Sequence, residues 1–394
     1  MRRFFPFLLF LFFIAIFLRI DFFFTIAYLF VLLFLMARLW IGRGLQQVHF
    51  ERQYTPRAFS GDEVAVQVTV HNRGRLPVPW LHVHESLPVE LVSPPFHTEV
   101  FSLGAGERHF FRYTLHARQR GIYPLGPLSA QTGDVLGLEP TRTADFDAQP
   151  IVVYPRVVPM ARLRLPTRSP LVALPARTPL FEDPARISGV RDYQRGDSPR
   201  RIHWTATASA GRLLVKQYQP AVARETVLAL DLDLDGYEGR RRREASELAI
   251  VAAASLANHI IVVERLAVGL ATEALDPVVH TRKRFLLPAR SERAHLISLL
   301  EVLARVRLVP GTPLPDLLRR ERPHLAWGTT VVAITGRADE ALLDALAALR
   351  QGGCAVALLL VQAAAMEPLA RERAALLGIN VWPIWREQDL ERSA

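Results

Sequence analysis

Hydrophobic residues are unevenly placed along this chain, and its N-terminal segment holds long apolar runs. Residues 4–18 and 22–37 are almost purely apolar and are separated only by residues 19–21. A single helix over both runs would be about 50 Å long at ~1.5 Å per residue, whereas the hydrocarbon core of a bilayer is ~30 Å thick. The pattern therefore predicts a transmembrane helical hairpin in residues 1–40, with a tight turn between two short arms.

The charges beside these arms predict their orientation. Arg2 and Arg3 precede the first arm, while Arg38 and Arg43 follow the second. Because cations collect on the cytoplasmic side of membranes, we expect both chain termini in the cytoplasm and only the turn outside. A cleaved signal peptide is the alternative, but no small-x-small cleavage site precedes the second arm, and that arm continues without interruption.

Residues 46–160 change to the alternation that is typical of β-strands. Valines at positions 64, 66, 68 and 70 alternate with small or polar residues, which is the period of a half-buried strand. Further strand candidates, at spacings normal for a sandwich, are residues 80–85, 99–103, 108–117 and 151–154. The region predicts an all-β, sandwich-like domain, and its sequence holds no cluster of catalytic residue types.

Two shorter segments follow this β region. Residues 161–185 hold several prolines and arginines without periodicity and predict a linker. Residues 186–220 predict a compact unit of a short strand, a turn, a helix and a second strand. We expect Asp197 or Ser198 to cap that helix, Pro199 to lie in its first turn and Gly211 to end it.

Residues 221–390 alternate between apolar strands and amphipathic helices. This alternation predicts a mainly parallel, doubly wound α/β sheet, and hence a multidomain chain. The predicted strands are residues 226–232, 265–272, 284–287, 329–335, 354–361 and 379–384. The predicted helices are residues 243–261, 291–304, 314–322, 340–351 and 364–377.

The overall charge is basic, with 48 Lys and Arg against 38 Asp and Glu. On a tethered protein, attraction to anionic lipid head groups explains such an excess as readily as nucleic acid does. Because no nucleic-acid-binding signature accompanies it, we expect membrane lipid as a partner and no nucleic acid. The single cysteine, Cys354, excludes a disulfide framework and suggests a buried thiol.

Residues 187–219 crowd cations, acids and aromatic side chains into one unit. The pattern is R-x-Y-x-x-G-D-x-x-R-x-I-x-W, followed by L-x-V-K, and it is carried by Arg191, Tyr193, Gly196, Asp197, Arg200, Ile202, Trp204 and Lys216. In one interpretation Asp197 caps the helix while Trp204 and Tyr193 fill a local core. In the other, Arg191, Arg195, Arg200, His203 and Lys216 face outward and bind an acidic partner or phosphate, and Arg and Trp are the side chains most enriched at the energetic centres of interfaces.

This pattern resembles the signature of the domain-of-unknown-function 58 family of bacterial membrane proteins. Residues 120–138, with R-G-I-Y-P-L-G-P and T-G-D-V-L-G-L, and the V-Y-P of residues 153–155 resemble further elements of that family. The resemblance implies a von Willebrand A-like C-terminal domain and a place in the cytoplasmic (inner) membrane. It also implies companionship with a MoxR-type AAA+ ATPase in the assembly of envelope or other complexes, with no defined activity.

Three acids follow the first strand of the α/β region, at Asp231, Asp233 and Asp235. Ligands of open α/β sheets bind beyond the carboxyl ends of the strands. The position is similar to the D-x-S-x-S metal motif of von Willebrand A domains, and the G-T-P-L of residues 311–314 resembles the loop that supplies the next ligand, here Thr312. Carboxylate and hydroxyl oxygens of this kind can hold Mg²⁺ or Ca²⁺.

The metal motif is incomplete, which leaves a degenerate acidic loop as the alternative. Both serines are replaced by aspartates, and residues 334–337 lack the expected further acid. Carboxylates so close repel each other unless a cation neutralises them, and the arginine run at residues 240–243 is a candidate for that role. A calcium-binding EF-hand loop is a weak match, because its twelfth position would be Arg242 and a strand precedes it.

An enzyme is a further alternative, since D-x-D after an apolar strand is similar to haloacid-dehalogenase phosphatases, with Asp231 as nucleophile. Thr335 and Asp339 can serve that chemistry, but no lysine stands in the expected order. We therefore expect a non-enzymatic, membrane-anchored adaptor that binds protein partners. A metal-dependent phosphohydrolase using Asp231 and a basic lipid-surface-binding protein remain the alternatives.

Overall fold

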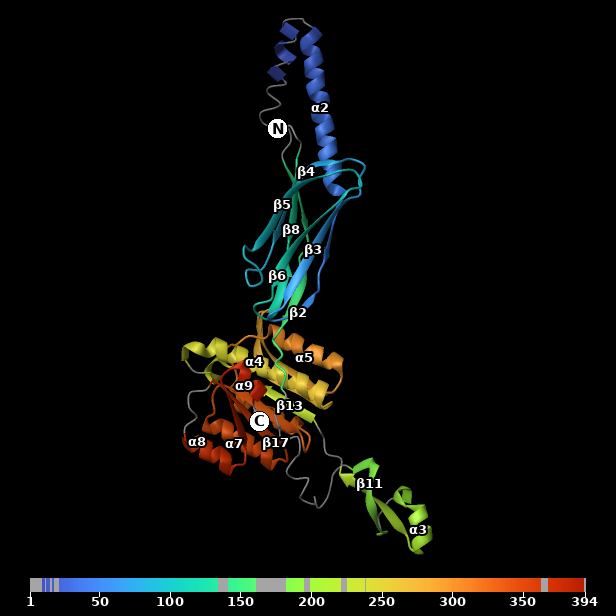
Figure 1. Cartoon of the computed structure of the whole chain (residues 1–394), viewed down its shortest axis with the longest axis vertical. Helices are drawn as coiled ribbons and strands as arrows, with labels where there is room; N and C mark the ends of the chain where they lie inside the picture. Colours follow the sequence, from blue (N-terminus) through green and yellow to red (C-terminus); the bar gives the residue numbers. More distant parts are fainter. Residues whose placement is uncertain are drawn as a thin grey trace. The chain divides into compact units, whose positions relative to one another are not determined.

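The computed structural model describes residues 9–392 except 11, 15, 18–20, 134–140, 161–181, 195–198, 221–224, 238 and 363–367. The chain divides into two compact units, Met1–Arg156 and Val157–Ala394, which we describe separately (Figure 1). The multidomain organisation predicted from the sequence is confirmed. Most of the predicted linker, and Gly196 and Asp197 of the signature, lie outside the described residues.

The first unit begins with the long helix α2 (Asp21–Gln46), which contains the second predicted arm and continues beyond it. In the first arm the described residues are helical, and the rings of Phe12 and Phe24 meet edge to face with 5.8 Å between their centroids. The two apolar segments therefore lie side by side at this point (Figure 1).

Membrane crossing itself stays a prediction. Among the described residues, the helix long and apolar enough to cross a bilayer is Arg242–Val263, and 72% of its apolar stretch is buried inside the second unit. The apolar part of α2, Phe24–Met36, is shorter.

The rest of the first unit is all β. Its strands form sheets with the orders β1-β3-β6, β2-β10-β7 and β5-β4-β8-β9, in which the β2–β10 pair is parallel and the other pairs are antiparallel. The valines of β3 that alternate in the sequence are all buried, which confirms the period-two prediction. The strands are β1 (Val48–Gln53), β2 (Arg57–Phe59), β3 (Glu63–Asn72), β4 (Val78–Ser86), β5 (Phe96–Leu103), β6 (Arg108–His116), β7 (Gly121–Leu125), β8 (Leu128–Thr132), β9 (Arg142–Phe146) and β10 (Gln149–Tyr154).

An ion pair lies inside the core of this β domain. Arg52 Nε on β1 donates to Glu85 Oε1 on β4 at 2.5 Å, and their side chains are 6% and 0% exposed. Because β1 belongs to the sheet β1-β3-β6 and β4 to the sheet β5-β4-β8-β9, the ion pair connects these two sheets. Removing one partner would leave the other charge buried and unpaired, which is costly.

The signature residues form a small unit of their own. β11 (Glu182–Asp192) pairs antiparallel with β12 (Leu214–Pro220), and the 3₁₀ turn η2 (Pro199–Arg201) and the helix α3 (Trp204–Ala210) lie between them in the chain. β11 begins inside the stretch that we assigned to the linker.

The predicted beginning of the signature helix is wrong. Pro199 starts a single 3₁₀ turn, and α3 begins only at Trp204, with the His203 side chain accepting from the Ala206 N–H at 3.2 Å. Between them, the N–H of buried Ile202 donates to Pro199 O at 3.2 Å and closes the 3₁₀ turn, and the residue forms a β-bridge to Val215 of β12 that interrupts the helical path. Gly211 ends α3 as predicted, because its φ of 67° is a left-handed conformation that favours glycine.

The α/β part of the second unit is a mixed, Rossmann-like sheet with strand order β15-β14-β13-β16-β17-β18. All neighbours are parallel except the β14–β15 hairpin, which confirms the predicted mainly parallel sheet. The strands are β13 (Glu225–Leu230), β14 (Ala267–Asp276), β15 (Thr281–Arg290), β16 (Thr330–Thr335), β17 (Ala355–Val361) and β18 (Asn380–Ile384).

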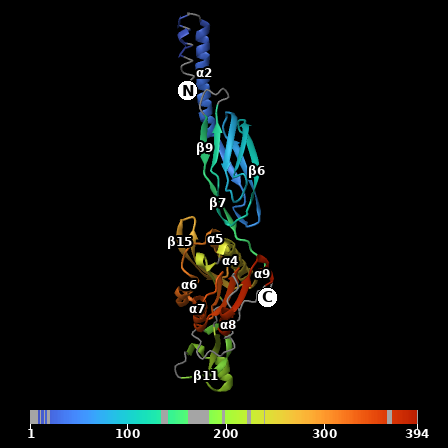
Figure 2. The same ribbon diagram turned by 90° about the vertical axis from the view of Figure 1, so that its left-hand side faces the viewer.

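Helices cover both faces of this sheet, as a doubly wound fold requires. α4 contacts α5 and α9 on one face, while α7 contacts α6 and α8 on the other (Figures 1 and 2). The α-helices are α4 (Arg242–Asn258), α5 (Arg293–Arg305), α6 (Leu314–Glu321), α7 (Glu340–Gln351), α8 (Pro368–Leu376) and α9 (Glu387–Arg392). Single turns are η3 (Leu234–Gly236), η4 (Gly239–Arg241), the π-turn η5 (His259–Val263) and η6 (Arg322–His324).

The strand order places a topological switch point at β13. The chain leaves β13 through α4 to β14 on one side, whereas β16 on the other side is reached only after the crossing segment that precedes α6. Open α/β sheets bind ligands at the carboxyl end of the strands where the order reverses in this way. The acidic residues predicted from the sequence lie at this position. Buried Cys354 lies away from this position, directly before the amino end of the interior strand β17.

Candidate functional site

Backbone pairing between two loops builds the switch point. Asp231 N donates to Ile334 O of β16 at 2.9 Å, which extends the β13–β16 pairing into the acidic loop. Val309 N donates to Leu232 O, and Leu234 N donates to Val309 O, both at 3.1 Å. The segment before α6 is therefore fixed across the carboxyl end of β13.

Asp231 is buried beneath this loop, with 5% of its surface exposed. Its Oδ2 accepts from Thr335 Oγ1 at 2.7 Å, and its Oδ1 accepts from the Asp233 N–H at 3.0 Å. Gly236 lies directly against the carboxylate, because a Cβ at that position would be 2.2 Å from Oδ2. Tyr237, which is also buried, donates its hydroxyl to Asp231 O at 2.7 Å. The carboxyl group is thus covered by η3.

Burial is the main reason that the pKa of Asp231 rises from 3.8 to about 7. The charges of Asp233 and Asp339 raise it further, whereas the hydrogen bonds from Thr335 and from the Asp233 N–H lower it. The group therefore changes protonation near neutral pH inside the fold.

The other two acids have different surroundings. Asp233 is 6% exposed, and its Oδ1 accepts from the Gly311 N–H at 2.6 Å, so it fixes the G-T-P-L loop. Asp235, in the first turn of η3, is exposed to solvent. The structure thus brings Asp231 and Asp233 together under the loop and leaves Asp235 outside.

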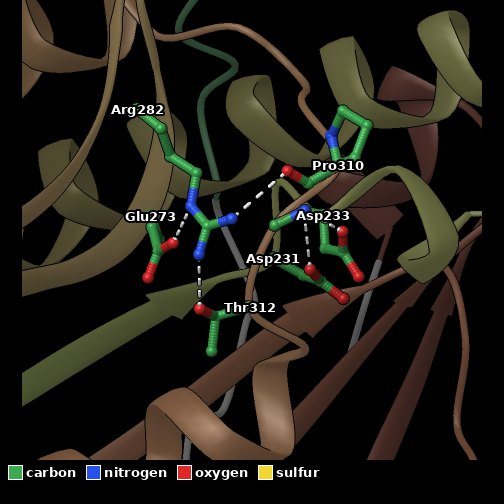
Figure 3. A network of polar contacts seen from close by, with 7 residues as sticks. Asp231, Asp233, Glu273, Arg282, Pro310 and Thr312 are labelled. Carbon is green, nitrogen blue, oxygen red and sulfur yellow. Dashed lines mark hydrogen bonds and ion pairs between the residues drawn. The ribbon is translucent and has the colours of Figure 1, made fainter.

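Thr312 lies on the same loop but is engaged by an arginine that our sequence analysis missed. Arg282 of β15 donates from Nη2 to Thr312 Oγ1 at 3.0 Å and from Nη1 to Pro310 O at 3.5 Å, and its Nε pairs with Glu273 of β14 (Figure 3). Arg282 thus places a guanidinium beside this loop. The run at residues 240–243 was expected to neutralise the three acids themselves, and the Arg240 side chain of that run lies outside the described part. The cation run 282–284 on an edge strand was the available signal.

The oxygen atoms predicted as metal ligands, as arranged here, do not fit a Mg²⁺ or Ca²⁺ centre. Both oxygens of Asp231 already accept hydrogen bonds, and Oδ2 lies against the backbone of Gly236. The Thr312 hydroxyl faces a guanidinium, which repels a second cation. Within the residues that the structure describes, no group of three or more His, Cys, Asp and Glu side chains is placed to hold a metal ion.

The signature unit exposes large side chains. Trp204 is 67% exposed and Tyr193 is 36% exposed, and Val190 and Leu213 are exposed as well. Arg191 and Lys216 are half-buried. The backbone of Arg200 is described, but its side chain lies outside the described part.

The core of this unit is made of other residues than the ones we expected. Ile202, Leu214 and Val215 are buried, and the Thr207 hydroxyl accepts from the Leu214 N–H at 3.0 Å, which fixes α3 to β12. α3 itself has no buried residue. The interpretation in which Trp204 fills a local core is therefore wrong.

The Rossmann-like sheet, with its acidic switch point and attached signature unit, defines the second unit as an α/β domain. Residues 189–363 match the family described as a protein of unknown function, DUF58. This match supports the resemblance carried by the signature and spans both candidate sites. Comparison with curated proteins gives no match.

Solved structures that resemble parts of the chain do so weakly. The CARDB domain of a Pyrococcus furiosus protein, solved in complex with di-metal ions, is 18% identical over 27% of this chain and 91% of that one, with a TM-score of 0.20. A β-glucosidase from Listeria innocua is 14% identical over 28% of this chain and 16% of that one, with a TM-score of 0.18. An alkylpurine DNA glycosylase from Pseudomonas fluorescens, bound to DNA containing an abasic site analog, is 15% identical over 30% of this chain and 35% of that one, with a TM-score of 0.19. Likenesses of this size carry no argument about function.

Proposed function

We propose that this protein is a membrane-anchored, non-enzymatic adaptor that binds a protein partner through its signature face. This face consists of Val190, Tyr193, Trp204 and Leu213. The observation that carries the proposal is the 67% exposure of Trp204. A tryptophan that contributes nothing to its own core leaves a large apolar surface in water, and covering that surface is favourable.

The construction of α3 supports the same conclusion. This helix has no buried residue, and it is held through its His203 cap, its Gly211 end and the Thr207 bond to β12. Its exposed side chains, Trp204 among them, can therefore contact another molecule. Trp and Tyr are enriched at the energetic centres of interfaces, where they bury large rigid rings.

Charge suggests the chemistry of the partner. Residues 187–219 contain six Lys and Arg against two Asp, so the unit carries a positive charge. A partner with an acidic surface would be attracted and oriented by this charge. The family resemblance makes a MoxR-type AAA+ ATPase the first candidate, in the assembly of envelope or other complexes.

We propose that the α/β domain is von Willebrand A-like and that its acid pair holds the switch-point loops in shape. Asp231 and Asp233 bond to β16, to their own loop and to the G-T-P-L loop, while Arg282 supplies positive charge beside Thr312. The anchor would be the hairpin formed by α2 and the apolar segment before it. Both termini would lie on the cytoplasmic side of the inner membrane, with the basic flanks against lipid.

The test is capture of partners from native membranes by the tagged full chain. We expect Trp204→Ala to reduce the retained ATPase by roughly 30-fold, the loss that corresponds to a hot-spot residue. Trp385→Ala is the matched control, because Trp385 is also exposed but lies next to α9. Equal capture by both variants would contradict the signature face as the binding surface.

The same preparation separates the adaptor from an enzyme. We expect no turnover of a generic phosphate ester with Mg²⁺, because the Asp231 carboxyl is covered by Gly236 and hydrogen-bonded at both oxygens. If the protein turns over the ester and Asp231→Asn abolishes this turnover, the protein is a phosphohydrolase and the adaptor proposal is wrong. If partner capture requires Mg²⁺ and fails in EDTA, the result would instead support the hypothesis that the acids form a metal-dependent adhesion site.

A further inference from the structure

One end of the β domain, where α2 meets it, carries a row of basic side chains. His49 of β1 lies opposite His71 of β3, and His71 lies opposite Arg108 of β6, so three basic residues stand side by side across the sheet. Arg73 and Arg75 follow in the β3–β4 loop and are exposed. We call these five residues the cationic rim.

The β3–β4 loop is fixed to the last turns of α2. Trp40 Nε1 donates to Pro77 O at 2.7 Å, although the two residues are 37 positions apart. Arg73 N donates to Gln47 O at 2.9 Å, so the other end of the loop is held as well. The loop therefore has a defined position along the helix axis (Figure 1).

That position corresponds to the head-group layer of a bilayer crossed by α2. The apolar part of α2 ends at Met36, and Trp40 lies four residues later, which is ~6 Å along the axis at ~1.5 Å per residue. The head-group layer on each side of the hydrocarbon is roughly 5–8 Å thick. Tryptophan is enriched in this layer, where its ring is amphipathic. A loop bonded to the Trp40 ring lies at the same level.

The rim is electrostatically positive. Its charge comes from the three arginines, because desolvation and then the nearby charges of Arg108, Arg73 and His49 lower the pKa of His71, so that this histidine is neutral at neutral pH. The strand pairing places His49, His71 and Arg108 side by side. In the part of the chain that the structure describes, none of the three rim arginines has an ion-pair partner. The acid of the neighbouring turn, Glu107, accepts from the Gly104 N–H at 2.5 Å.

We infer that the cationic rim binds the anionic head groups of the bilayer in which α2 is anchored. This inference rests on the membrane anchor of the proposed function. Arginine suits the role because its guanidinium forms two parallel hydrogen bonds to a phosphate group. The rim then holds the β domain against the membrane surface, so that lipid composition controls how freely the β3–β4 loop moves.

The test uses the full chain in nanodiscs made of zwitterionic lipid alone or with an added anionic phospholipid. Hydrogen exchange is measured on peptides that cover the β3–β4 loop, where Arg73 N and Gly74 N are hydrogen-bonded. Anionic lipid is expected to slow this exchange by roughly fivefold for each cation that contacts the surface, and high salt is expected to remove the effect.

Two charge-matched variants locate the effect. Arg73→Gln/Arg75→Gln is expected to lose most of the difference between the two kinds of disc and to keep at most the roughly fivefold share of Arg108. Arg112→Gln/Arg118→Gln removes equal charge from the middle of β6 and from two residues beyond its end, and it is expected to keep the wild-type difference.

Three results would overturn the inference. In the first, the chain inserts into the discs but wild-type exchange does not depend on anionic lipid. The rim inference would then be wrong, whereas the membrane anchor would be supported. The second is slowing by inorganic phosphate alone in zwitterionic discs, which would make free phosphate the ligand. If the chain does not enter the discs at all, the anchor and the rim fail together.

Discussion

Replacing Asp231 by asparagine is expected to remove a pH dependence from the stability of the central sheet. Asparagine keeps the shape of the side chain, and its Oδ1 can still accept from the Asp233 N–H. Its amide can donate to Thr335 Oγ1, whose hydroxyl can turn toward Gly236 O at 3.5 Å. The variant therefore resembles the protonated form of Asp231 and cannot ionise.

The magnitude follows from the pKa of Asp231, which rises from 3.8 to about 7 on folding. Because the folded pKa is the higher one, the stabilisation is complete below the unfolded pKa of 3.8 and is lost as the pH rises through about 7. At ~1.36 kcal/mol for each unit, the full loss is ~4 kcal/mol. Roughly 2.5 kcal/mol of it falls between about pH 5 and about pH 7.5.

Hydrogen exchange on the full chain measures this effect locally. The free energy of opening for peptides covering β13 and β16, corrected for the intrinsic exchange rate, is expected to fall with pH in the wild type and to stay level in Asp231→Asn. The variant should be the more stable protein at about pH 7.5, with a gap that narrows toward about pH 5. Asp235→Asn is the matched control, because this exposed acid lies in the same loop.

Two outcomes would refute the reasoning. Wild-type stability that is flat or rises over this range would mean that burial does not raise the pKa of Asp231. An equal slope in Asp231→Asn would assign the pH dependence to another group.

Further substitutions test other parts of the fold, each by thermal unfolding and hydrogen exchange of the full chain. Gly236→Ala forces η3 away from the carboxylate beneath it and is expected to cost roughly 1–3 kcal/mol, whereas Gly189→Ala, with open space around it, should cost far less. Glu85→Gln leaves Arg52 buried without a charged partner, and a loss of roughly 3–5 kcal/mol is expected in the β domain. Gly211→Ala puts a side chain at a φ of 67°, so the signature unit should lose roughly 1–2 kcal/mol.

Much of the fold was predictable because burial leaves a local, periodic trace in the sequence. The buried valines of β3 alternate at period two, and the interior strands β16 and β17 are buried at every position and mostly apolar. These patterns depend only on which face of an element is covered. Of β15 the sequence predicted only residues 284–287, and the antiparallel pairing with β14 was not predicted. The reason is that β15 exposes its charged half and lies at the edge of the sheet.

The signature unit shows where local rules fail. Pro199 after a capping residue is a normal start for a helix, yet the helix begins later. Burial of Ile202 against β12 is a tertiary contact that no helix-start rule includes. His203 as the N-cap was missed for the same reason, since it becomes a cap only after the chain leaves the strand bridge.

The acidic site was predicted as a set of residues but not as an arrangement. The sequence places Asp231 and Asp233 after a strand, and the doubly wound order then brings them to the switch point. Their partners come from distant positions: Thr335 from β16 and Gly311 from the segment that crosses before α6. Pairing over such separations depends on strand order, which a single sequence does not contain.

The arrangement at the switch point explains why we place partner binding elsewhere. In an open α/β sheet this position is the usual site for a ligand. Here Thr335 and Gly236 enclose one carboxylate, the Gly311 N–H engages the other, and Arg282 lies on the adjoining hydroxyl of Thr312. Groups that usually face a ligand are thus satisfied within the chain. The exposed ring of Trp204 has no such internal partner in the described structure, so a second molecule is the natural cover for the signature face.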